Sequence, residues 1–196
     1  FFSTDKITTA QMNLMYNMSD VTILLSSNEG WGLALTESLM TGTPIIATVS
    51  GGMQDQMRFV DEKGKWIEFS RDFPSNHRGT YKQHGEWAFP VFPSNISCQG
   101  SVPTPYIYDD RVSIDDAAEA IYKVYSIGKE EREKIGNKGL EWVKGDEANM
   151  TAEKMCNGVI KVLDKAFDNF IPRTSFDFHK IKELPSKYIK HKLTGY

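Results

Sequence analysis

The strongest constraint on the fold is a strand, turn, helix and strand in close succession. Residues 21–25 (VTILL) and 44–49 (PIIATV) are apolar runs rich in β-branched side chains, typical of strands buried on both faces of a parallel sheet. Residues 33–41 space leucines one helical turn apart, and Gly42 follows at a suitable C-cap position. The pattern predicts a βαβ unit with parallel strands and a right-handed crossover, and so an α/β fold.

Other segments predict further elements around this unit. Apolar periodicity predicts helices over residues 7–18, 53–60, 113–125, 130–144 and 151–170. Further strands are expected over 65–69 and 106–108. Between about residue 70 and residue 105 no period is visible, which predicts a loop insertion, either a functional lid or a disordered segment.

Composition narrows the class of protein. With 196 residues, 40% hydrophobic and 25% charged, the chain can bury a core as a globular protein. A net charge of −3 provides no general basic field for nucleic acid. No apolar run approaches the roughly 20 residues of a membrane-spanning helix. Only two, widely separated cysteines favour a reducing compartment, so a cytoplasmic location is expected.

The turn after the first predicted strand carries the candidate site. Gly30 and Gly32 allow close approach of the backbone to a ligand, and the helix that begins near Leu33 directs free N–H groups to the same place. This arrangement attracts phosphate. Glu29 precedes the turn and Glu37 lies one turn into the helix, where a carboxylate can accept hydrogen bonds from vicinal hydroxyls. Phosphate flanked by two such carboxylates describes a nucleotide sugar.

Other motifs are absent or weak. The dinucleotide fingerprint fails because Leu35 occupies the position of its third glycine, and the chain has no phosphate-binding P-loop. Asp109-Asp110 is interpreted as a solvated loop start and not as a metal site. Three further potential ligands have no zinc-type spacing and are interpreted as loop residues: His77, His84 and Cys98.

Residues 29–47 (EGWGLALTESLMTGTPIIA) resemble the signature of retaining GT-B glycosyltransferases of family GT4, with its E-x7-E motif. Residues 50–57 (SGGMQDQM) resemble the family's following Gly-Gly loop, with Asp55 where Glu is usual. The predicted helices between residues 115 and 170 are also similar to the family.

The resemblance implies that the chain is the donor-binding part of such an enzyme, with a doubly wound, Rossmann-like parallel sheet. Glu29 would contact the transferred sugar as the catalytic residue, and Glu37 would bind the ribose hydroxyls. Backbone N–H groups at the helix N-terminus would stabilise the diphosphate as it leaves, so no metal or other cofactor is expected. The remaining donor-binding residues implied are Gly30, Trp31, Gly32 and Leu33.

The resemblance also predicts the organisation of the chain. Residues 1–170 would form a partial nucleotide-sugar-binding domain with the insertion at about 70–105, and 171–196 a basic tail with six Lys or Arg against two acids. Because the chain opens without Met, we expect a piece of a longer enzyme that lacks its N-terminal acceptor domain and is inactive alone. An exposed sheet edge then favours a homo-oligomer.

Alternatives remain open from the sequence. The chain could be a non-catalytic nucleotide-binding or interaction module, or a GT-B sugar-nucleotide epimerase. The basic tail is expected to pack against the missing domain, with a membrane-peripheral role as the alternative. The indole of Trp31 fits a core or a ligand contact equally well. The acceptor can be a sugar, a lipid or a protein.

Overall fold

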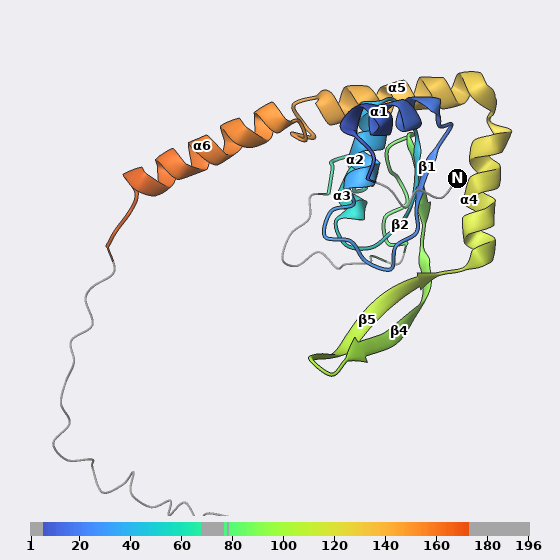
Figure 1. Cartoon of the computed structure of the whole chain (residues 1–196), viewed down its shortest axis with the longest axis horizontal. Coiled ribbons are helices and arrows are strands. Elements are labelled where there is room, and N and C mark those ends of the chain that lie inside the picture. Colours follow the sequence, from blue (N-terminus) through green and yellow to red (C-terminus); the bar gives the residue numbers. More distant parts are fainter. Residues whose placement is uncertain (1–5, 68–76, 78, 173–196) are drawn as a thin grey trace, which may run out of the picture. The chain divides into compact units, whose positions relative to one another are not determined.

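A computed structural model describes residues 6–67, 77 and 79–172. The chain divides into two compact units, residues 1–156 and 157–196. In the first unit a parallel sheet has helices on both faces, with α2 and α4 on opposite sides (Figure 1). The predicted α/β class is therefore confirmed, with a three-stranded parallel sheet.

The order of the elements matches the βαβ pattern that the sequence predicted. The three sheet strands are β1 (Thr22–Leu24), β2 (Ile45–Thr48) and β3 (Ala88–Val91), in that spatial order and all parallel. A separate antiparallel hairpin consists of β4 (Pro93–Ser101) and β5 (Thr104–Val112). The helices are α1 (Thr9–Met18), α2 (Leu33–Met40), α3 (Met53–Met57), α4 (Ile114–Ser126), α5 (Gly128–Lys144) and α6 (Ala152–Asp168).

The third strand of the sheet is not where the sequence placed it. Of the predicted strand at 65–69, the described residues make only one isolated bridge, between Trp66 and Val60. The sheet is instead completed by β3, which contains Pro90. A proline argues against a strand in the sequence, but β3 is an edge strand, where the missing N–H group is tolerated.

The prediction of an irregular loop over residues 70–105 is wrong for its second half. This half contains β3, β4 and the start of β5. The sequence did not predict the hairpin because most of its side chains are exposed on both faces. Burial therefore imposes no alternation of polar and apolar residues along its strands. Residues 70–76 and 78 lie outside the described residues, as do 173–196 of the predicted tail.

The core lies on both faces of β2, whose four residues are all buried. Ile45 and Ala47 point to one face and pack with residues of α2, α3 and α5. Ile46 points to the other face and packs with Ala120 and Val124 of α4. This alternation explains why the sequence of β2 reads as a continuous apolar run.

The first strand departs from the predicted burial on both faces. Ile23 pairs with Ile46 and so shares its face of the sheet, yet its side chain is 43% exposed. The reason is that α4 packs on β3, at the far side of the sheet from β1. Leu24, on the opposite face, packs against the main core.

Helix α5 approaches the sheet closely through two glycines. A Cβ on Gly136 would collide with the carbonyl oxygen of Gly42, and a Cβ on Gly139 would lie 2.9 Å from both Leu39 and Trp87. Gly42 has a φ of +74° just after α2, which confirms its predicted capping role. The turn that ends α2 therefore fits directly against α5.

The second unit contains most of α6, which confirms the predicted helix. Its apolar side chains are exposed, and those on the long stripe are Val159, Ile160, Val162, Leu163 and Phe167. Within the described part of the chain, no helix combines the length and apolar character needed to cross a membrane.

Two histidines, His77 and His84, lie outside helices and strands, as predicted, and belong to an aromatic cluster. The His77 ring lies 4.4 Å from that of Phe59 and 5.5 Å from that of Phe92. The His84 ring lies 5.9 Å from the same Phe59. Burial lowers the pKa of both imidazoles, although each also has a backbone hydrogen bond that opposes this shift.

This cluster predicts that acidification destabilises the fold. Both histidines titrate near pH 6.5 when unfolded and at lower pH when folded. Their contribution to stability is complete above pH 6.5 and is lost as the pH falls through the folded pKa values. We expect unfolding in urea to have a constant midpoint between pH 8 and 7 and a falling one below pH 6.5.

The control is a His77→Phe, His84→Gln double variant, in which the ring at residue 77 can still pack against Phe59. It should show a weaker pH dependence between pH 6.5 and 5. An unchanged dependence would contradict the assignment to these two groups.

Candidate functional site

The Glu29–Gly32 turn lies where the carboxyl end of β1 leads into α2. Gly32 is the N-cap of α2 and has a φ of +83°, a conformation that favours glycine. It is also buried, and a Cβ there would lie 3.2 Å from side-chain atoms of Leu24 and Met53. Leu33 begins the helix with an exposed side chain, so the N-terminal end of α2 borders solvent.

The loop after β2 packs directly against this turn. The N–H of Gly52 donates to the carbonyl oxygen of Glu29 over 3.0 Å. A Cβ on Gly51 would collide with that same oxygen, and a Cβ on Gly52 with the carbonyl oxygen of Gly30. The sequence left open whether Gly51-Gly52 is a simple turn, and the structure brings it against the candidate site.

A buried glutamine that was not among the predicted site residues holds the turn through hydrogen bonds to its backbone. Gln56 of α3 is fully buried, and its Nε2 donates to the carbonyl oxygens of Trp31 and Gly32 over 2.6 and 3.1 Å. Its Oε1 accepts from Thr36, whose hydroxyl in turn accepts from the indole N–H of Trp31. The sequence of α3, MQDQM, carried no signal for this role, because Gln56 lies beside two other polar residues, Gln54 and Asp55.

This network engages the indole of Trp31, a residue predicted to bind the donor. Its N–H is used within the protein, and the side chain is half-buried. The residue also lines a pocket of about 340 Å³ together with Asp55, Trp66 and residues 147–150. Trp31 is therefore part of the packing around the turn and also borders a cavity, while its contact with a ligand stays a prediction.

Glu37 lies one turn into α2, and its carboxylate is exposed. Its Oε2 accepts a hydrogen bond of 2.9 Å from the hydroxyl of Tyr16 in α1. Partial burial and this bond to Glu37 raise the pKa of Tyr16 to about 12. Tyr16 was also missed from the sequence, where the methionines of α1 dominate the apolar pattern, although Met15 and Met18 are exposed.

Asp110 corrects the prediction of a solvated loop start at residues 109 and 110. Both residues lie in β5, and Asp110 is only 9% exposed. Its Oδ2 accepts from the hydroxyl of Ser50 over 2.6 Å, while Asp109 pairs with Arg111 over 3.4 Å. Among the described residues no group of three His, Cys, Asp or Glu is placed to hold a metal ion.

The site residues therefore gather at the carboxyl edge of the sheet. The turn from Glu29 to Leu33 is continuous with the N-terminus of α2, and the α2 amides of Leu33 and Ala34 precede the first helical hydrogen bond, from Leu35 to Gly32. Such amides attract anions. In open α/β sheets this edge is where ligands bind.

A known protein family matches the first part of the chain. Residues 3–71 match the family model described as glycosyl transferases group 1. This part of the chain is a group 1 glycosyltransferase domain, which confirms the resemblance to family GT4. The match includes Glu29, Glu37 and the loop at 50–52, whereas the hairpin and α4 to α6 lie outside it. No curated protein matches the chain.

Proposed function

We propose that this domain binds the nucleoside-diphosphate sugar of a retaining glycosyltransferase reaction. The observation that carries the proposal is the joining of the Glu29–Gly32 turn, the N-terminus of α2 and the Gly51-Gly52 loop at the carboxyl edge of the sheet. A ligand with a phosphate and hydroxyl groups would use the helix amides together with the carboxylates of Glu29 and Glu37.

Each residue then has a defined task. The amides at the start of α2 bind the diphosphate and stabilise the charge that it gains as its bond to the sugar breaks. Glu29 is half-buried, and its carboxylate has no hydrogen bond to another described residue, so it is available to the transferred sugar. Glu37 accepts hydrogen bonds from the ribose hydroxyls, with Tyr16 holding one of its oxygens in place.

Gly30 supports close approach by a ligand. It is exposed, its φ is not positive, and a Cβ there would meet no atom within 4 Å. Neither the backbone conformation nor packing within the described chain therefore requires a glycine. A bound diphosphate sugar lying against the backbone gives a reason for it.

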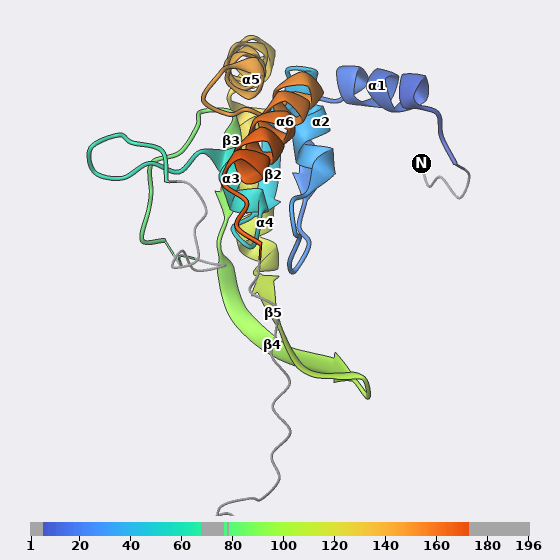
Figure 2. The same ribbon diagram turned by 90° about the vertical axis from the view of Figure 1, so that its left-hand side faces the viewer.

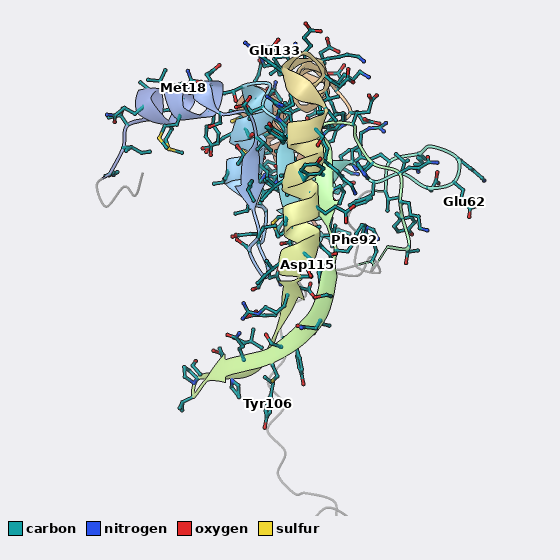
Figure 3. The ribbon with its side chains drawn as sticks, turned by 90° about the vertical axis from the view of Figure 1, so that its right-hand side faces the viewer. Met18, Glu62, Phe92, Tyr106, Asp115 and Glu133 are labelled. Atoms are coloured by element: carbon teal, nitrogen blue, oxygen red, sulfur yellow. The ribbon has the colours of Figure 1, made fainter. Side chains whose placement is uncertain are left out.

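The test is ligand-observed NMR of the chain with UDP, GDP, ADP and their common sugars. We expect one nucleotide series to bind and Glu37→Ala to weaken that binding at least tenfold, because two ribose hydroxyls lose their acceptor. Glu62→Ala is the matched control, since Glu62 is an exposed carboxylate on a different loop (Figure 3).

Two outcomes would contradict the proposal. One is the absence of binding by any nucleotide to a chain that remains folded by circular dichroism. The other is an equal loss of binding in Glu37→Ala and Glu62→Ala. Once an acceptor is known, comparing the anomeric configuration of the transferred sugar in the donor and in the product tests whether the reaction retains it.

A further inference from the structure

The β4–β5 hairpin stands beside the candidate site. The carboxyl end of β3 continues through Phe92 into β4, and β5 returns to α4 through Ser113. In Figure 2 the hairpin extends away from the sheet as a curved ribbon. Its base is attached to the site, because Ser50, which bonds Asp110, lies in the same loop as Gly52, which bonds Glu29.

One face of the hairpin lies on the same side as the loop after β2, which packs against the candidate site. Ile96 lies opposite Asp110, and Cys98 lies opposite Tyr108. Because side chains alternate along a strand, these four residues share one face. Asp110 on that face reaches Ser50, so the face continues outward from the loops that form the candidate site.

The composition of the hairpin differs from that of the rest of the chain. No residue from Pro93 to Tyr108 is charged, in a protein with 25% charged residues. Tyr108 is 66% exposed, and the side chain of Tyr106, 76% exposed, projects from the ribbon (Figure 3). The other side chains are mainly hydroxyls and amides, from Ser, Thr, Asn and Gln.

We propose that this face of the hairpin contributes to acceptor binding and that the acceptor is a neutral carbohydrate chain. This inference rests on the proposed glycosyltransferase function. A tyrosine ring offers an apolar surface for the C–H face of a sugar at a low cost in side-chain entropy, and its hydroxyl offers a hydrogen bond. Neighbouring hydroxyl and amide groups suit sugar hydroxyls.

Charge argues against anionic acceptors. Arg111 is the cation nearest along the chain to this uncharged segment, and it already pairs with Asp109 and donates to Ser97. Nucleic acids and acidic lipid surfaces are recognised through several unpaired cations. A neutral, polyhydroxylated ligand needs none.

The test uses an array of immobilised oligosaccharides, neutral and sialylated, probed with the fluorescently labelled full chain. We expect binding to neutral glycans, with roughly tenfold weaker binding by Tyr108→Ala and nearly full binding by Tyr108→Phe. The matched control is Ile107→Ala, which removes a neighbouring exposed apolar side chain from the other face.

A second variant separates this proposal from the proposed function. Replacing residues 97–109 by Asn-Gly shortens the hairpin and leaves Ile96 opposite Asp110, as they are paired in the structure, so Asp110 and its bond to Ser50 are kept. We expect this variant to lose glycan binding and to keep nucleotide binding in the NMR assay. If neither the parent chain nor any variant binds a nucleotide, but the parent still binds glycans in a way that depends on Tyr108, the donor site is refuted and the acceptor proposal stands.

Several results would overturn the inference. They are no glycan binding by the parent chain, equal binding by Tyr108→Ala, and a preference for sialylated glycans. If the parent binds no glycan and shortening the hairpin converts an oligomer into a monomer in light scattering, the hairpin is an interface between copies of the chain.

Discussion

Gly52→Ala should destabilise the protein by about 3 kcal/mol and abolish nucleotide binding. Gly52 has an ordinary helical φ of −71°, so the cost is purely steric. The new Cβ would collide with the carbonyl oxygen of Gly30 and would lie 2.8 Å from its carbon and 2.9 Å from the Cα of Trp31. These are backbone atoms of the candidate site, which cannot move aside as a flexible side chain can.

The matched control is Gly30→Ala, on the other side of the same contact. Its Cβ enters open space, so we expect stability within about 0.5 kcal/mol of the parent. Urea unfolding measures stability, and NMR with the nucleotide measures binding. If Gly52→Ala were as stable as Gly30→Ala, the two loops would not be packed as described. If Gly30→Ala bound nucleotide sugars normally, Gly30 would not lie against the donor.

The second large effect is expected for Trp142→Ala, at about 4 kcal/mol. The Trp142 ring stacks on that of Trp87 at 4.9 Å and meets the edge of Trp66 at 5.7 Å. Its indole N–H donates to Glu147 over 2.8 Å. The change removes all three interactions from the core, and the melting temperature should fall by roughly 10 °C.

Trp142→Phe separates packing from hydrogen bonding. It keeps an aromatic ring beside Trp87 but leaves Glu147 with Arg58 alone, so we expect a smaller loss of about 1–2 kcal/mol. Calorimetry of both variants gives the comparison. Equal losses in the two variants would show that the stacked rings contribute little.

The predictable part of the fold is the part that is buried. The apolar run of β2 and the leucines of α2 predicted their elements because both contribute to the core. Gly42 predicted the end of α2 because the chain needs a left-handed backbone conformation there, which favours glycine. In contrast, β3 was missed because Pro90 argues against a strand, and the hairpin because most of its side chains are exposed.

Only the part of the candidate site that is formed by consecutive residues could be predicted from the sequence. The turn from Glu29 to Leu33 carries its own pattern of glycines and a carboxylate. The groups that position it come from elsewhere: Gln56 reaches the turn from α3, and Tyr16 reaches Glu37 from α1. Such contacts depend on packing between elements, and periodicity within one segment carries no information about them.

The hairpin enters and leaves the domain at adjacent points, since Pro93 and Val112 are paired. A segment attached in this way can be lengthened, shortened or exchanged in a single genetic event without altering the path of the chain on either side. Residues of the matched domain, which carry the proposed donor chemistry, all precede it. Under the two proposed roles, evolution can therefore change the acceptor that is bound independently of the sugar that is transferred.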